Sequence, residues 1–513
     1  MMRDDLTPRR GRGPAAAGAH PFAPPRRLVA GAGAVALAGA LSACGAPTSA
    51  DDAGDFFDTS TVHTVAVEYD EDDYQEMLDT FADTGDKDWI SATVTIDGEE
   101  YDDVGLRLKG NSSLRGLGGD GQDDQQAPGF DEGDGSASAD DPAGLPWLIR
   151  LDKYVDGQEH DGRADLVVRG NTTESSLNEA VALQVLALAG VTAEQATYTR
   201  FSVNGGDEQL RLVVDLPDDD LWNEDNYPDG GITYKADADG DWGVKDDAAA
   251  YAESFEAKYD STGGTDEEAY APLAEFLELV NDSTDEEFAA HLGDHLDVDS
   301  FARYLAAQDL VANSDDIDGP GNNAYLHYDP DTGLMEVVAW DQNLSYGGMG
   351  GMGGMGGTGR PGGQGNEPPE GMEPPDGAEL PDGAEAPDGQ QAPPDGGQPE
   401  GFDPQEGGQG APGGGFGGGN VLVTRFLENE DFAAAYESAL EDLTTSVYDS
   451  GDAQDYLDAV TSTLSADASD LVDADTLESE SQEIADLLTG DAVQSRADRA
   501  SGQASQEGSS VEP

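Results

Sequence analysis

Residues 347–419 are so rich in glycine, proline and aspartate that they cannot supply a hydrophobic core. The stretch opens with Gly-Gly-Met triplets and continues with Pro-Asp-Gly-Ala-Glu units at Pro375 and Pro381, which degenerate at Pro387. Such a composition buries too little apolar surface to offset the conformational entropy lost on folding. We therefore expect a long disordered insertion, with the folded part of the chain on either side of it.

The rest of the chain mixes strand-like and helix-like patterns, which predicts an α+β fold. The clearest strand pattern starts at residue 62, and Asp97-Gly98 predicts the turn of a hairpin. The expected segments are a signal peptide (1–43), a tether (44–61), a first region (62–214) with a loop insertion (115–145), a second region (215–346), the disordered insertion (347–419), closing helices (420–489) and a polar tail (490–513).

The chain is strongly acidic. It carries 108 Asp and Glu against 24 Lys and Arg, a formal net charge of −84. Proteins that bind DNA, RNA or anionic lipid by electrostatic attraction need clustered positive charge. The composition therefore argues against a nucleic-acid-binding protein and favours cations, basic proteins, or a ligand held by a local basic site.

An apolar run of 16 residues, 28–43, follows Arg26-Arg27 and ends in Leu-Ser-Ala before Cys44. The run is too short for a membrane-spanning helix and has the basic start and small-residue end of a secretory signal peptide. Leu-Ser-Ala-Cys resembles the lipobox of bacterial lipoproteins, in which the cysteine is lipidated and becomes the first mature residue. The alternative is an ordinary cleaved signal followed by a chance cysteine. Lipidation implies an extracytoplasmic protein anchored to the bacterial cell membrane.

Residues 313–341 contain a group of carboxylates and amides typical of a metal site. A hairpin centred at residue 332 would set Asn323 opposite Asp341 at its open end, with Asp315 delivered by the preceding loop. Two carboxylates and an amide oxygen suit Mg²⁺, a hard cation with few protein ligands. Protein kinases carry a catalytic Asp, a metal-binding Asn, a hairpin and a metal-binding Asp in this order. Asp and Asn are also ordinary turn residues, so an acidic chain can bring them together without a metal.

Several motifs occur in order along most of the chain. They are Gly105-Leu-Arg-Leu-Lys-Gly-Asn-Ser-Ser113, Leu151-Asp-Lys-Tyr154, the apolar stretch 177–191, Val203-Asn-Gly205, and the run from Asn323 to Trp340-Asp341 and Gly347. Together they resemble the CotH kinase family, the spore coat protein H-like proteins, over about residues 62–346 and again at 421–445. The resemblance implies a two-lobed atypical protein-kinase-like fold that binds ATP and Mg²⁺. It also implies phosphorylation of Ser or Thr in protein substrates, and a chain this acidic suits basic ones.

The resemblance also implies roles for single residues. Asp315 falls at the catalytic-loop Asp, with Asp316 as the neighbouring alternative, and Asn323 and Asp341 fall at metal-binding positions. For nucleotide binding, the resemblance implies Lys109, Asn111, Ser112, Arg150 and Glu179.

The expected roles of Arg150 and Glu179 each have a difficulty. Arg150 stands where the family commonly has Lys, and the two side chains are not interchangeable. Glu179 lies on an apolar helix face, where it would need a cation such as Arg150. It could instead form a capping box with Ser176, which serves only the helix end.

Two functions are therefore expected from the sequence. The first is an active, lipid-anchored kinase acting on extracytoplasmic proteins. The alternative is a catalytically degenerate kinase fold that serves as a surface binding or envelope-scaffold lipoprotein. The alternative is favoured by Arg150 and by the scarcity of ATP outside the cytoplasmic membrane.

We predict that Cys44 carries lipid in the native protein, because the apolar run ends at it and the chain holds no second cysteine to pair with it. Mass spectrometry of the mature N-terminal peptide checks this. Recovery of soluble protein from the culture supernatant with a free thiol at Cys44 would contradict it.

Overall fold

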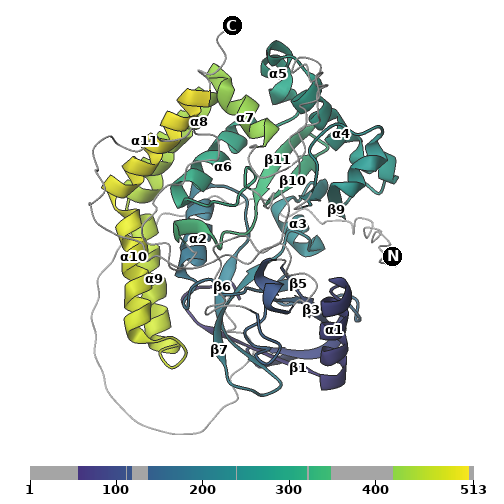
Figure 1. Cartoon of the computed structure of the whole chain (residues 1–513), viewed down its shortest axis with the longest axis vertical. Helices are drawn as coiled ribbons and strands as arrows, with labels where there is room; N and C mark the ends of the chain where they lie inside the picture. The colour runs from purple at the N-terminus through teal and green to yellow at the C-terminus, as the bar shows by residue number, and fades with distance from the viewer. Residues whose placement is uncertain are drawn as a thin grey trace, which may run out of the picture.

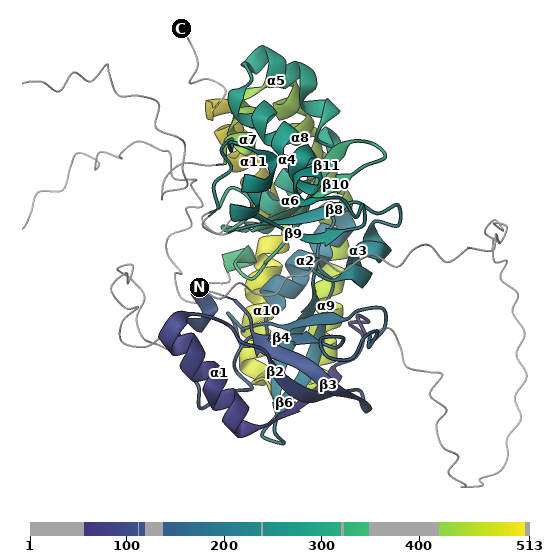
Figure 2. The same cartoon turned by 90° about the vertical axis from the view of Figure 1, so that its right-hand side faces the viewer.

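The computed structural model describes six stretches of the chain, residues 56–110, 112–117, 137–237, 240–319, 323–347 and 420–507. Helices and strands are mixed within them, in agreement with the expected α+β class. The strands form a closed barrel and a separate four-stranded sheet. Figure 2 shows the barrel at one end of the molecule and the second sheet at the other. We call residues 56–215 the barrel part and the later described residues the helical part.

The barrel has the strand order β1-β2-β3-β4-β5-β7-β6 and is closed by parallel pairing of β6 with β1. Helix α1 (Glu71–Thr84) connects the first two strands. The strands are β1 (His63–Tyr69), β2 (Ile90–Ile96), β3 (Glu99–Leu108), β4 (Trp147–Arg150), β5 (Asp165–Val168), β6 (Ala196–Val203) and β7 (Gln209–Asp215).

The turn predicted at Asp97-Gly98 is confirmed. Ile96 pairs with Glu99, and the two turn residues have φ of 47° and 86°. Positive φ at both central positions is what a two-residue hairpin turn requires, and Asp-Gly tolerates it at low cost.

Alternation along β4 divides its side chains between two cores. Trp147 and Ile149 lie in the core inside the barrel, whereas Leu148 packs in the larger core of the helical part. Arg107 on β3 is directly opposite Leu148, and cross-strand partners share a face of the sheet. The strands therefore present a row of basic residues toward the helical part.

The second sheet has the order β11-β10-β8-β9. Its strands are β8 (Ile232–Ala236), β9 (Phe255–Asp260), β10 (Ala324–Asp329) and β11 (Leu334–Ala339). The hairpin of β10 and β11 was expected, but its register is one residue different. Asp329 pairs with Leu334 and Ala324 with Ala339, so the loop has four residues and Asp341 does not lie opposite Asn323.

Helix α2 of the barrel part and the helices of the helical part pack against this sheet, against one another or beside the barrel (Figure 1). They are α2 (Leu177–Ala189), α3 (Asp220–Asn226), α4 (Asp266–Asp282), α5 (Asp285–His291), α6 (Val298–Val311), α7 (Val421–Glu428), α8 (Glu430–Leu443), α9 (Asp452–Asp467), α10 (Ala474–Leu488) and α11 (Gly490–Glu507). No helix in these stretches is long and apolar enough to span a membrane.

Helix α2 is buried on almost every side because its sequence is apolar all round. It packs against α6, α9 and α10 and ends at Gly190, whose φ of 69° gives the left-handed helix end that glycine favours. The helix thus lies in the centre of the molecule, between the barrel and the C-terminal helices (Figure 1).

The segment expected to be a polar tail begins as a helix that packs on the core. Val493, Ala497 and Ala500 of α11 are buried, at a spacing that puts them on one face. Arg496 on the same helix donates a hydrogen bond to the Leu310 carbonyl at 2.8 Å. Nearly all of the expected disordered insertion and most of the loop 115–145 lie outside the described residues, as do the signal peptide, Cys44 and the tether up to residue 55. The end of the expected tether is wrong, because Phe56 is buried in the core of the barrel and its N–H donates to Asp161 at 2.9 Å.

Candidate active site

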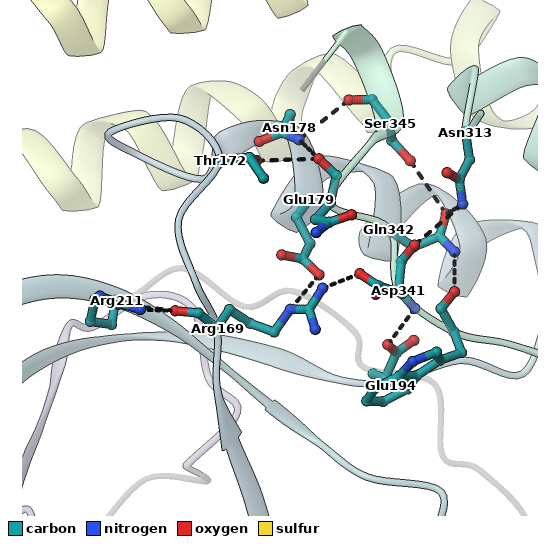
Figure 3. A network of polar contacts seen from close by, with 12 residues as sticks. Arg169, Thr172, Asn178, Glu179, Glu194, Arg211, Asn313, Asp341, Gln342 and Ser345 are labelled. Carbon is teal, nitrogen blue, oxygen red and sulfur yellow. Dashed lines mark hydrogen bonds and ion pairs between the residues drawn. The ribbon is translucent and has the colours of Figure 1, made fainter. Parts of the chain in front are cut away.

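The guanidinium of Arg169 lies between two carboxylates that come from distant parts of the chain (Figure 3). Its Nε is 2.9 Å from Glu179 Oε1 on α2, and its NH2 group contacts Asp341 Oδ1 just after β11. Burial alone would lower the pKa of Arg169, but the Asp341 and Glu179 carboxylates raise it above its ordinary value. Arg169 is therefore a permanent cation that joins the strand end after β5 to α2 and to the Asp341 loop.

The pairing expected between Arg150 and Glu179 is wrong. Arg150 binds Asp165 on the neighbouring strand through both Nε, at 2.7 Å, and NH2. The capping box is also absent, because Ser176 has a left-handed φ of 51° and its side chain caps no helix N–H. Glu179 is thus left to face Arg169, where burial raises the pKa of its carboxyl against the opposing effect of the guanidinium.

Asp341 is held in an unusual backbone conformation by its neighbours. Its φ is 64°, its N–H donates to Glu194 Oε1 at 3.0 Å, and its carbonyl accepts from Asn313 Nδ2 at 3.4 Å. A non-glycine residue with positive φ persists where its surroundings determine it, often at functional sites. Burial raises the pKa of Glu194 to about 8, against the opposing effect of the hydrogen bond from the Asp341 N–H.

Asn323 contacts Asp315 rather than Asp341. Its Nδ2 donates to Asp315 Oδ2 at 3.0 Å, and its backbone N–H donates to the Asp316 carbonyl at 3.3 Å. In the same loop, Asp318 accepts a hydrogen bond from the N–H of Asn420 at the start of α7. The expected metal-site residues are therefore in one region, at the same end of the hairpin, but the side chain of Asn323 bonds to Asp315 and that of Asp341 to Arg169.

No group of three or more His, Cys, Asp and Glu side chains within the described stretches is arranged to hold a metal ion. The donor types nevertheless fit Mg²⁺, because Asp341 supplies a carboxylate and Asn323 an amide oxygen. The Asn323 side chain uses its nitrogen in the contact with Asp315, which leaves the oxygen for a cation.

Three basic side chains surround the indole of Trp340, the residue before Asp341. Lys109 Nζ, Lys235 Nζ and Arg169 Cζ lie 5.4, 5.7 and 5.9 Å from its ring centroid. Burial lowers the pKa of both Lys109 and Lys235 to about 8; nearby positive charges add to the lowering, and carboxylates, Asp218 among them, oppose it. Neither lysine forms an ion pair with any residue that the structure describes.

The basic residues continue from Trp340 to a second indole, that of Trp89. Arg107, Lys153 and Arg150 lie 4.7, 4.7 and 5.5 Å from its ring centroid. Gly105 makes this packing possible, since a Cβ there would be 2.5 Å from the Lys153 side chain. The Nε of Arg107 is buried and has no hydrogen-bond partner in the described part of the chain.

We call this group of residues the basic cluster. Lys258 joins it through Asp218, which it approaches to 3.3 Å, and Asp218 also accepts a hydrogen bond from Tyr325. Five of the six lysines in the whole sequence belong to the cluster, and the sixth, Lys245, pairs with Asp241. The members are Lys87, Arg107, Lys109, Arg150, Lys153, Arg169, Lys235 and Lys258.

Sequence reasoning found Lys109, Arg150 and Glu179 in this region but missed other members. Asn111 lies outside the described residues, and the side chain of Ser112 is not described. Lys235 was missed because a lone lysine in a strand carries no motif. Asp318 could have been found, since it precedes Asn323 by five residues, the spacing of the kinase catalytic-loop Asp and its metal-binding Asn.

Comparison with known proteins identifies the family. The sequence model of the family described as "CotH kinase protein" matches residues 135–484, more than half of the chain. The chain belongs to the CotH kinase family. It is also 26% identical over 174 residues to the inner spore coat protein H of Bacillus subtilis strain 168. That alignment covers 34% of this chain and 47% of the relative, so the chain spans about half the length of the relative that it matches.

Membership of the CotH family indicates a kinase-like protein and agrees with the resemblance read from the sequence. The matched region contains Arg169, Glu179, Glu194, Lys235 and Asp341, but it starts after Lys109 and Trp89. The basic cluster therefore combines residues inside the matched region with residues from the first strands of the barrel.

We predict that the lowered pKa values of Lys109 and Lys235 make stability rise with pH. Each pKa falls from 10.5 to about 8 on folding, so the unfolded chain binds more protons between those values. The contribution of these two lysines to the free energy of unfolding should therefore increase as pH rises from about 8 to 10.5, and it is read from the difference between wild type and the variants below. Urea unfolding across this range measures it.

Lys109→Met and Lys235→Met should each flatten this rise, because methionine keeps much of the apolar stem and removes the titrating group. Lys245→Met, outside the basic cluster, is the control and should leave the slope unchanged. If both cluster variants kept the wild-type slope, the two lysines would not be the buried, proton-releasing groups described here.

Proposed function

We propose that the chain is a kinase that transfers a phosphoryl group from ATP, with Mg²⁺, to Ser or Thr of extracytoplasmic proteins. The observation that carries the proposal is the basic cluster. In a chain of net charge −84, five of six lysines belong to this cluster, and three of them, Lys109, Lys153 and Lys235, lie over its two tryptophans. Arg107, Lys109 and Lys235 form no ion pair with any described residue.

Unpaired positive charges packed together are unfavourable unless an anion joins them. Several cations at slightly different positions suit a ligand with several negative charges spread along its length, as in a triphosphate. Lysine and arginine are also the usual residues for binding phosphate oxygens. Like-charge repulsion within the basic cluster therefore favours a polyphosphate ligand over a single carboxylate.

The ion pair of Arg169 and Glu179 supports kinase chemistry. In protein kinases a Lys on a strand pairs with a Glu on the helix that follows, and this pair is required for activity. Here β5 leads through Arg169 directly into the segment before α2, so the pair occurs in the same chain order. Arg169, rather than Arg150, would then take the part of the kinase Lys.

Asp341 and Asn323 would hold Mg²⁺, which supplies charge neutralisation at the phosphates when it is bound. The chain's own residues orient the two substrates: Lys109 and Lys235 would bind phosphate oxygens, and Arg169 would hold Asp341 and Glu179 in place. Positioning and charge complementarity carry most of the catalysis in phosphoryl transfer.

Asp318 would accept or orient the proton of the attacking hydroxyl, in preference to Asp315. Its spacing of five residues from Asn323 is that of the kinase catalytic loop, whereas Asp315 precedes Asn323 by eight. Asp315 also contacts the Asn323 amide and would fix the direction in which that side chain points.

The place of action and the acceptor are part of the same proposal. The lipobox-like sequence at Cys44 supports anchoring to the outer side of the cytoplasmic membrane, and the acidity of the chain supports basic proteins as acceptors. The alternative, a degenerate kinase fold acting as a binding or scaffold lipoprotein, is supported by the engagement of Asp341 with Arg169 and of Asp318 with Asn420.

We predict that Asp341→Asn and Asp318→Asn separate metal-dependent binding from transfer. Asp341→Asn should lose Mg²⁺-dependent ATP binding, because it removes the charged metal ligand. Asp318→Asn should keep ATP binding and lower the rate of transfer by about 10²- to 10⁴-fold, the usual contribution of a general base. Calorimetry with ATP and phosphate transfer to a basic Ser- and Thr-containing protein measure the two effects.

Asp331→Asn, in the exposed turn of the hairpin, is the matched control and should behave as wild type. A larger loss of transfer in Asp315→Asn than in Asp318→Asn would return the catalytic role to Asp315. Unchanged transfer in folded Asp341→Asn would remove Asp341 from its role as the charged metal ligand, and a wild type that neither binds ATP nor transfers phosphate would remove the kinase assignment. A wild type that binds ATP without transferring phosphate would favour the binding-protein alternative.

A further inference from the structure

Glu480 on α10 holds the chain immediately before α2. Its Oε1 accepts a hydrogen bond from the Glu174 N–H at 2.9 Å, and its Oε2 accepts from the Ser175 N–H, also at 2.9 Å, and from the Ser175 hydroxyl. Bonds to an ionised carboxylate are stronger than neutral ones, and negative charge at a helix N-terminus is favourable. One side chain of the C-terminal helices thus fixes the entry of the helix that carries Glu179.

The same entry segment is bonded to the loop that carries Asp341 (Figure 3). Asn178 Nδ2 donates to the Asn343 carbonyl at 2.7 Å and to the Ser345 carbonyl at 3.3 Å, and Thr172 donates to Asn343 at 3.2 Å. Movement of residues 172–178 would therefore displace Asp341 together with Glu179.

The helices α9 and α10 are also fastened to the barrel. Arg200 on β6 donates to both carboxylate oxygens of Asp470, at 2.9 and 2.6 Å, and to the Asp467 carbonyl at 3.0 Å. Both cartoons show these two helices running from the helical part alongside the barrel (Figure 1 and Figure 2). Glu480 is therefore carried by a pair of helices with fixed contacts to both parts of the molecule.

We propose that Glu480 is a positioning residue for the candidate active site, and that α9 and α10 hold α2 in the orientation in which Glu179 meets Arg169. This inference rests on the proposed kinase function. In protein kinases the position of the Glu-bearing helix is a point of control. Here Glu480 of the same chain holds the start of α2 in place, so the site is assembled without an activating partner.

Glu480→Ala in the mature chain tests the proposal, with Glu483→Ala as the control on an exposed position of the same helix. The expected result is a fall in kcat of about 10- to 100-fold, the usual effect of losing a residue that orients a ligand-binding group. The KM for ATP should change little, since Lys109 and Lys235 remain. Glu480→Gln keeps one acceptor oxygen and should recover part of the activity.

Hydrogen exchange separates positioning from a loss of folding. The hydrogen bonds of Glu480 go to Glu174 and Ser175 and not to residues 341–345. Faster exchange of the Asp341 and Ser345 amides in Glu480→Ala would therefore show that its effect reaches the site. Unchanged exchange there, or a fall in kcat explained by the unfolded fraction alone, would overturn the proposal. If wild type transfers no phosphate, the proposed function fails, and the exchange at 341–345 still decides whether Glu480 positions this loop.

Discussion

The ion pairs of Arg169 with Glu179 and Asp341 are the interaction on which the centre of this structure depends. Glu179 belongs to a helix that is otherwise almost entirely apolar, and its carboxylate could not stay buried there without a cation. Removing one partner of a buried ion pair typically costs about 3–5 kcal/mol, because the other charge is left uncompensated. The barrel, α2 and the strand end after β11 are therefore joined at one guanidinium.

Charge is distributed very unevenly in this molecule. Acidic residues occur throughout the sequence, whereas the lysines and arginines of the basic cluster lie near Trp89 and Trp340. Burial, and after it repulsion from neighbouring basic residues, lowers the pKa of Lys109 and Lys235, and an anion bound between them would offset the repulsion. An acidic exterior with a local basic site also favours polyanions only where their geometry matches, since the surrounding field repels them.

Much of the fold could be predicted from local pattern. Asp97-Gly98 forms the expected turn, and the apolar segment 177–191 forms a buried helix that ends at Gly190. These predictions hold because each rests on a backbone preference or on apolar periodicity. The buried face of α11 was also visible in the spacing of Val493, Ala497 and Ala500, but the surrounding polar residues hid it.

The candidate site was harder to predict because it depends on distant contacts. The turn sequence 329–333 allows more than one loop length, so the register of the hairpin was wrong by one residue. Arg150 and Arg169 both lie at strand ends, and only the barrel topology shows that Arg169 faces α2 while Arg150 faces Asp165. The Ser176 to Glu179 pattern fits a capping box, yet the backbone of Ser176 forbids it.

The central claim is that the basic cluster binds the phosphates of a nucleotide, and competition between nucleotides tests it most directly. Calorimetric titration of the full chain with ATP and with AMP, each in the presence of Mg²⁺, compares ligands that differ only in phosphate number. The account predicts that ATP binds much more tightly than AMP and that Lys235→Met removes most of this difference. Equal affinity for the two nucleotides, or no binding of either, would contradict the account.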